Sequence, residues 1–289
     1  MNQATLGILY GLLAMIPIGL ANAISKRPSQ SLGASRLLFY RTILTSILLF
    51  VVLLFNLDQS NFNLAYALAA FGLSFIAFIA MLFLYKAYAV GKIGIVTPIM
   101  SSSAVISIPL SVIFLEAVLS KTQAYLIALI TIGIILLTIN FKDWKKSSLL
   151  QSGTGILYAI ITAIAYGLFF FLAQIPNRAL GQYAAALIFE LGILFFTAIQ
   201  IGISRQNIKI PDRKNICFIL SIAVLTVLSI LGLYTGLNKA SAGVVLAFSS
   251  ASTLVVCLYG LLIYKEKLSL SQYVGTVIIV LSMVLLSLA

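Results

Sequence analysis

Stretches of about 20 apolar residues, each long enough to cross a bilayer as a helix, follow one another along almost the whole chain. Only short polar segments separate them. A chain inside the bilayer must satisfy its backbone hydrogen bonds internally, and a helix does this within each stretch. We therefore predict an all-α integral membrane protein with ten transmembrane helices. They are expected at residues 5–25, 33–55, 64–88, 93–118, 122–140, 152–174, 181–203, 216–238, 241–263 and 270–288.

The composition excludes a soluble domain and several kinds of active site. Hydrophobic residues make up 62% of the 289 residues and charged residues 8%, whereas average chains are about 25% charged. Two cysteines provide no disulfide framework, and the absence of histidine excludes a histidine-based metal site or proton relay. The chain has no phosphate-binding Gly-rich loop with a lysine. We expect neither an enzyme nor a bound cofactor or metal.

The first half of the chain resembles the second. Gly7-Ile8-Leu9-Tyr10 recurs at 155–158, and seven of the 20 positions from 7 to 26 are identical at an offset of 148. At an offset of 149, residues 85, 94, 96, 101, 103 and 123 recur at 234, 243, 245, 250, 252 and 272. We assign five-helix repeats to 1–141 and 149–289, joined by a basic loop at 142–148. An odd number of helices inverts the second copy, as in secondary transporters with a central cavity.

The basic residues predict which side of the membrane each loop faces. Of the 18 lysines and arginines, 14 follow the first, third, fifth, seventh and ninth helices, and three lie on the opposite side. The positive-inside rule makes the first set of loops cytoplasmic and places both termini outside. We expect a multi-pass protein of the plasma membrane, the inner membrane in a bacterium. The charges are divided among loops rather than gathered on one face, so we expect no nucleic-acid partner.

Two charged residues within the expected spans are candidates for function. Glu190 is the one carboxylate well inside a span, and Arg41, in the second helix, is its approximate repeat counterpart. Ionisable groups inside a membrane are costly and commonly functional. They could pair across the axis relating the repeats, or Glu190 could bind a proton. Alternatively, each could extend toward its own membrane interface.

A neutral polar strip is expected along the fourth and ninth helices. Pro98 and Pro109 free backbone carbonyls and bend the fourth helix. Ser101 and Ser103 lie nearby, and their repeat counterparts are Ser250 and Ser252. We predict that these serines line the substrate cavity. The alternative is that small hydroxyl residues serve close helix packing.

Further cavity candidates are amide, aromatic and basic side chains near helix ends. Lys86 could bind a substrate carboxylate or extend to the membrane surface, and tyrosines at such positions also form interfacial belts. The candidates are Asn22, Tyr85, Lys86, Tyr88, Tyr166, Phe170, Tyr234 and Asn238.

Several segments resemble the EamA type of the drug/metabolite transporter superfamily. They are residues 84–98, 109–116, 243–250 and 264–275, the last resembling the family's Gly-Glu-x-Leu-small-x-x-Gln-x-x-Gly segment. The resemblance implies a ten-helix basket with a cavity lined by helices 1, 3, 4, 6, 8 and 9, moving amino acids, other small metabolites or nucleotide sugars. Leu115 and Lys265 replace the family's glycines, and the ninth helix lacks the proline matched by Pro98. We therefore expect a stiffer hinge in the second half.

These features together predict an alternating-access carrier for a small polar or zwitterionic metabolite, with amino-acid export as the first hypothesis. If Glu190 faces the cavity, protons could be exchanged; otherwise facilitated diffusion is simpler. The alternatives are an uptake carrier for a nucleoside-like or cationic metabolite, and a non-transporting membrane scaffold or receptor. The expected partners are the lipid bilayer, the small-molecule substrate and, in the first case, protons, with a monomer favoured.

Overall fold

The computed structural model describes residues 3–91, 93–115, 120–138, 155–208, 211–263 and 270–288, which are helical except at short connections. The all-α prediction is confirmed for these ranges, and the predicted connecting loop 142–148 lies outside them. The helices are α1 (Gln3–Leu32), α2 (Ala34–Leu54), η1 (Leu57–Gln59), α3 (Leu64–Val90), α4 (Ile93–Ser101), α5 (Ala104–Phe114), α6 (Lys121–Thr138), α8 (Ile156–Leu172), α9 (Gln174–Leu180), α10 (Gln182–Ile203), α11 (Arg213–Lys239), α12 (Ala242–Ser250), α13 (Ser252–Ile263) and α14 (Leu270–Leu288).

Eight segments of the described chain are long and apolar enough to cross a membrane. Five are single helices (α1, α2, α3, α10 and α11), and three are the consecutive pairs α4–α5, α8–α9 and α12–α13. Helices α6 and α14 contain shorter apolar stretches, Lys121–Leu136 and Tyr273–Ser282. Large apolar side chains such as Phe50, Phe195 and Leu228 are exposed on the long helices. An apolar exterior of this extent suits lipid rather than water.

Local sequence signals fix where several helices begin. Asn63 precedes α3, and its side-chain oxygen accepts a hydrogen bond from the backbone N–H of Ala65 at 3.0 Å, which caps the helix. Gly33 precedes α2 with φ 83° and ψ 157°, and Gly181 precedes α10 with φ 82° and ψ 156°. Residues that carry a side chain rarely adopt this backbone conformation, whereas glycine adopts it readily. Two helices 148 positions apart thus begin with the same glycine turn.

Three segments predicted as single helices are interrupted, which corrects the ranges 93–118, 152–174 and 241–263. At the α4–α5 break, the backbone N–H of Ser102 contacts the carbonyls of Pro98 (3.1 Å) and Ile99 (3.2 Å), which tightens the turn. Helix α12 ends before Ala251, although no proline is present there. The break at Ala251 lies 149 positions after Ser102. The absence of a proline predicted a stiffer hinge in the second half. The segment α12–α13 is nevertheless interrupted, as α4–α5 is.

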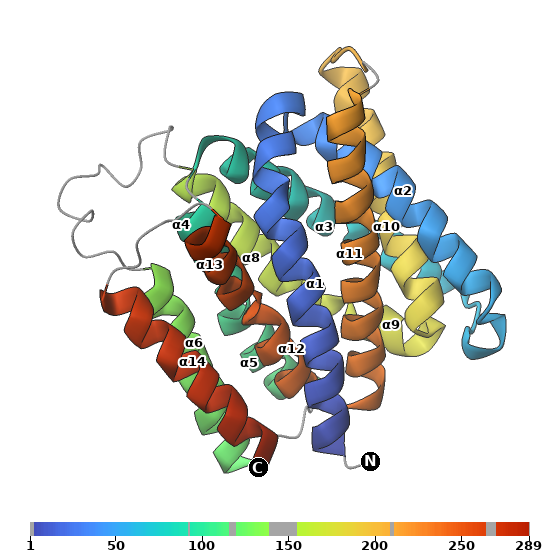
Figure 1. Cartoon of the computed structure of the whole chain (residues 1–289). Coiled ribbons are helices and arrows are strands. Elements are labelled where there is room, and N and C mark those ends of the chain that lie inside the picture. The colour runs from blue at the N-terminus through green and yellow to red at the C-terminus, as the bar shows by residue number, and fades with distance from the viewer. Residues whose placement is uncertain are drawn as a thin grey trace.

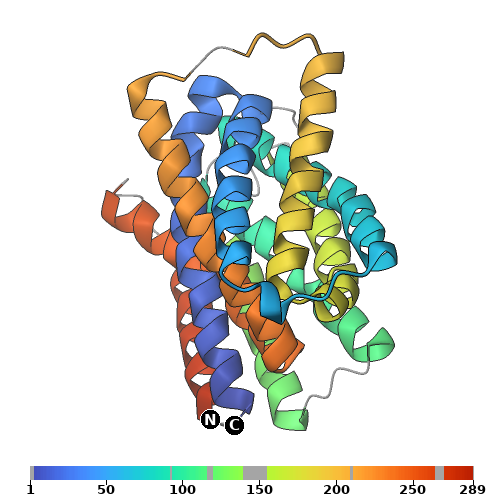
Figure 2. The same ribbon diagram turned by 90° about the vertical axis from the view of Figure 1, so that its right-hand side faces the viewer.

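The helices form a bundle in which elements from both ends of the sequence lie together (Figure 1). Helix α1 runs along α11, α3 lies against α8, and α10 contacts both α2 and α3. Helices α2 and α10 lie side by side and run in opposite directions (Figures 1 and 2). Helices α6 and α14 pair at the edge of the bundle, and both termini lie at one end of it (Figures 1 and 2).

Candidate functional site

A cavity of about 120 Å³ lies inside the bundle. Its walls come from α1, α2, α3, α4, α8, α10, α11 and α12, with residues at the α4–α5 and α12–α13 breaks. The resemblance implied a lining by the first, third, fourth, sixth, eighth and ninth of the ten expected helices. The structure adds α2 through Arg41 and α10 through Glu190 and Phe189. Segments from both halves of the chain therefore enclose this space.

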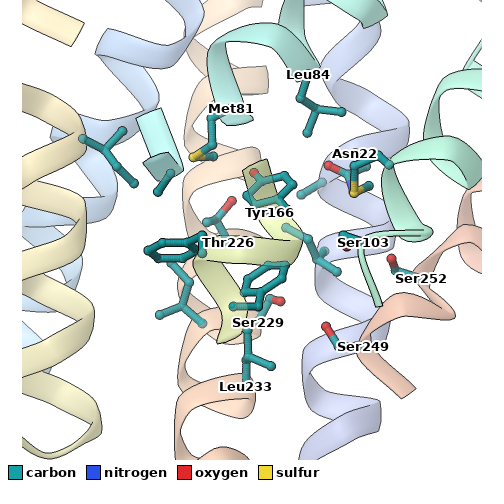
Figure 3. Close-up of a pocket in the computed structure, with 18 of the residues that line it drawn as sticks. Asn22, Met81, Leu84, Ser103, Tyr166, Thr226, Ser229, Leu233, Ser249 and Ser252 are labelled. Carbon is teal, nitrogen blue, oxygen red and sulfur yellow. The ribbon is translucent and has the colours of Figure 1, made fainter. Parts of the chain in front are cut away.

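Most of the candidate residues lie at the cavity wall. The structure places there Asn22, Arg41, Tyr85, Ser101, Ser103, Tyr166, Phe170, Glu190, Tyr234, Ser250 and Ser252. In Figure 3, Asn22, Ser103 and Ser252 lie to one side of Tyr166, and Met81 lies to the other. We call the first group, together with Ser101, the hydroxyl end.

Arg41 and Glu190 form a buried ion pair at the other end of the cavity. Nη2 of Arg41 lies 3.1 Å from Oε2 and 3.4 Å from Oε1 of Glu190. The same nitrogen lies 3.3 Å from Sδ of Met81 and 3.2 Å from Oγ1 of Thr42. Arg41 is 0% exposed and Glu190 is 3% exposed. Of the alternatives drawn from the sequence, pairing across the molecule is the one observed, and we call Arg41, Glu190 and Met81 the charged end.

The hydroxyl end lies where the interrupted segments α4–α5 and α12–α13 meet. Oγ of Ser101, at the end of α4, lies 2.6 Å from Oγ1 of Thr253, at the start of α13. Ser103 and Ser252, next to the two breaks, are buried and line the cavity. The breaks thus bring hydroxyl groups from both halves to the same wall. Hydroxyls can both donate and accept, so this end suits a neutral polar group.

Aromatic rings form much of the remaining wall. Tyr166 and Phe170, one turn apart on α8, stack with ring centroids 5.1 Å apart and an interplanar angle of 7°. Phe189 makes an edge contact with Phe169 at 5.1 Å and lies 5.7 Å from the ring of Tyr234. These rings supply apolar area and electron-rich faces for a bound molecule.

Three candidates lie elsewhere, which corrects their prediction as cavity residues. Lys86 points to the ring of Phe83, with Nζ 4.9 Å from its centroid. Tyr88 is fully buried, and its hydroxyl lies 3.2 Å from Oγ1 of Thr97. Lys86 directly follows Tyr85 on α3, and one step along a helix turns the side chain by about 100°. The Tyr88 hydroxyl instead joins α3 to Thr97 on α4.

The third misplaced candidate, Asn238 on α11, belongs to a cluster of amide side chains from three helices. Its Nδ2 donates to Oε1 of Gln182 (3.1 Å), and its Oδ1 accepts from Nδ2 of Asn177 (2.9 Å). Asn177 also donates to the backbone carbonyl of Tyr234 at 3.1 Å. The cluster joins α9, α10 and α11. Pro98 and Pro109 lie inside α4 and α5 and are absent from the cavity wall.

The cavity wall also contains Ser25, Thr226 and Ser229, which were not among the candidate residues. Ser25 follows Asn22 by three positions on α1, and Ser229 follows Thr226 by three on α11. Residues at this spacing share a helix face. Polar residues repeated at this interval in apolar helices were the signal that could have identified them. Ser229 also donates to the backbone carbonyl of Ala14 at 2.8 Å, which joins α11 to α1.

The site has the chemistry of a binding cavity. Within the described ranges, no group of three or more Cys, Asp or Glu side chains could hold a metal ion. The cavity offers one balanced pair of charges, several hydroxyls, an amide and aromatic faces. Such a surface binds and orients a small molecule.

Comparisons with known proteins agree with this description. The EamA-like transporter family matches the chain twice, over residues 5–139 and 153–288. An uncharacterized protein of Methanocaldococcus jannaschii is 30% identical over 136 residues, which are 47% of this chain and 98% of that protein. A crystal structure of a protein has the same fold, with a TM-score of 0.75, 12% identity, and coverage of 98% of this chain and 97% of the other. The chain belongs to the EamA-like transporter family.

Proposed function

We propose that the protein is a secondary transporter for a small polar or zwitterionic metabolite, with amino-acid export as the first hypothesis. The observation that carries this proposal is the cavity between the two halves, which contains a buried ion pair and hydroxyl groups. Membership in a transporter family supports the general activity. The choice of substrate rests on the chemistry of the wall.

We further propose that the two halves are inverted copies that rock against each other around this cavity. Three relationships support the symmetry. Gly33 and Gly181 share one backbone conformation, the breaks at Ser102 and Ala251 are 149 positions apart, and α2 and α10 run in opposite directions (Figure 1). Under this symmetry, Arg41 and Glu190 occupy positions of the two repeats that correspond to within one residue. Corresponding residues can touch only near the axis that relates the repeats, so the ion pair would lie close to that axis.

The remaining parts of the proposal concern placement and driving force. Ten helices would cross the membrane, with the basic loops cytoplasmic, both termini outside, and no partner chain required. Glu190 lines the cavity, which is the condition for proton exchange set out above. Replacing Glu190 with glutamine tests this coupling, because a pH dependence of transport that stays unchanged would rule it out.

Counterflow in liposomes tests the transport activity. Purified protein is reconstituted with an unlabelled amino acid inside the vesicles, and uptake of the labelled form is followed. Saturable exchange is the expected result, with nucleosides and polyamines as the competing substrate classes. Exchange of only one of those classes would support the transport activity and refute the proposed substrate class. Folded protein that exchanges none of them would favour a scaffold or receptor.

A further inference from the structure

Arg41 uses only one of its three side-chain nitrogens. Within the described residues, Nη2 makes the hydrogen-bond contacts of this side chain, to Glu190, Thr42 and Met81. Nε and Nη1 have no hydrogen-bond partner among the described residues. Leaving a buried donor unsatisfied costs about 1–3 kcal/mol, and more for a charged group. Because Arg41 is fully buried and lines the cavity, these free donors mark a place for an acceptor brought by a ligand.

Glu190 has unused hydrogen-bond acceptor sites. Both of its oxygens contact the same nitrogen of Arg41, and no other hydrogen bond to them is found within the described chain. A carboxylate has about four lone-pair sites, so these two contacts leave room for a donor. The two ends of one ion pair therefore present unused donors and unused acceptors next to each other.

Charge balance limits what can bind there. Arg41 and Glu190 are the charged residues of the cavity wall, and their charges cancel. A ligand with one net charge would leave that charge uncompensated in a buried site, which is costly. A zwitterion places a negative group at Arg41 and a positive group at Glu190 and adds no net charge. The site therefore favours a zwitterion over an amine or an acid of the same size.

The size of the cavity and the distance between its two charged groups narrow the class of ligand further. The cavity of about 120 Å³ is smaller than the ~150 Å³ cavity that admits benzene in a well-studied protein. Nη2 of Arg41 and Oε2 of Glu190 are 3.1 Å apart, so the two charges of the ligand must also be close. In an α-amino acid, a single carbon separates the ammonium from the carboxylate. A small α-amino acid satisfies both conditions.

We propose that Arg41 and Glu190 form a dual anchor for a small α-amino acid, in which Nε and Nη1 of Arg41 donate to the carboxylate and Glu190 accepts from the ammonium. This assignment rests on the proposed transport function, because it names the class of molecule that the cavity binds. The hydroxyl end and the stacked rings of Tyr166 and Phe170 then surround the side chain of the ligand.

The test removes one charged group at a time, first from the ligand and then from the protein. Isothermal titration calorimetry compares alanine and serine with their singly charged relatives: ethylamine and ethanolamine, which lack the carboxylate, and propionate and 3-hydroxypropionate, which lack the ammonium. We expect the natural protein to bind at least one amino acid about tenfold more tightly than both of its relatives. Binding without this discrimination, or no binding of either amino acid, would overturn the proposal.

The variants give the sharper result. In Glu190→Gln the remaining positive charge should favour the acids, in Arg41→Gln the remaining negative charge should favour the amines, and the double variant should favour neither. Lys86→Gln, which removes a cation on α3 outside the cavity wall, should keep the natural order of preference. A purely structural ion pair would lower the affinity for all three ligand types alike, and that outcome would contradict the anchor.

A milder variant keeps the test valid if the glutamine variants fail to fold. Arg41→Lys keeps the charge and loses the planar group with its additional donors. We expect amino-acid affinity to fall about tenfold, and an unchanged affinity would count against the anchor. Amino-acid binding without counterflow would refute the transport function alone. Counterflow of another compound class, without amino-acid binding, would refute the anchor alone.

Discussion

Nη2 of Arg41, on α2, lies 3.1 Å from Oε2 of Glu190, on α10, and the two residues are 149 positions apart in the chain. Each belongs to a different match of the EamA-like family. A direct contact between the two matched regions ties the halves together at the wall of the cavity. The same pair thus links the stability of the bundle to the properties of the site.

The ion pair should show strong energetic coupling. Replacing either Arg41 or Glu190 with glutamine leaves a buried charge without its partner, and we expect a loss of about 3–5 kcal/mol in the free energy of unfolding. The double variant should lose less than the sum of the two single variants. Equilibrium unfolding of all four proteins in detergent measures the cycle. Additive losses would show that the two side chains do not interact.

The stacked rings should contribute to substrate affinity. Phe170→Ala removes a ring that lines the cavity and stacks on Tyr166, and we expect KM for counterflow to rise about 2- to 10-fold. Phe171→Ala is the matched control, because Phe171 contacts Phe114 and is absent from the cavity wall. Equal effects of the two changes would contradict a role of the stack in binding.

The hydrogen bond between the two helix breaks should matter for both stability and transport. Ser101→Ala or Thr253→Val leaves the other hydroxyl buried without this 2.6 Å contact, at a cost of about 1–3 kcal/mol. The double variant should be no less stable than the worse single variant. Unfolding free energies and counterflow rates of the three variants check this, and a double variant that loses the sum of both would argue against a direct bond.

Close packing of α10 on α3 should make Gly192 intolerant of a side chain. A methyl group there would collide with the side chain of Ser74 and lie 3.2 Å from the carbonyl of Phe71, and overpacking costs about 1–3 kcal/mol. Gly72→Ala is the control, because nothing lies within 4 Å of that position. We expect Gly192→Ala to lower the melting temperature while Gly72→Ala leaves it unchanged or higher. The reverse order would be incompatible with this helix contact.

The positions of the helices followed from hydrophobicity, because membrane spans must be both long and apolar. Their interruptions were harder to predict. Pro98 marked the first break, but Ala251 has no comparable signal in the sequence. A break at such a residue depends on contacts between segments, such as the bond of Ser101 to Thr253. A sequence read one segment at a time does not contain that information.

The site was predictable at residues whose placement inside the membrane is energetically costly. A glutamate and an arginine inside apolar helices stood out, and the structure brings Glu190 and Arg41 together. Tyrosines, serines and amides are common in membrane helices, so their direction decides their role. Tyr85 lines the cavity, whereas the hydroxyl of Tyr88 is bonded to Thr97, a contact between α3 and α4 that the sequence of α3 alone does not predict.

The neutrality of the Arg41–Glu190 pair has an electrical consequence. A charge that crosses the membrane gains or loses about 2.3 kcal/mol per 100 mV, so a carrier with a charged cavity responds to voltage. Here the charges of the wall cancel, and a zwitterionic cargo would add none. Both the loaded and the empty cavity could then change sides without moving net charge. In a cycle without proton exchange at Glu190, the membrane potential would favour neither direction, and the concentration gradient of the cargo would determine the net flux.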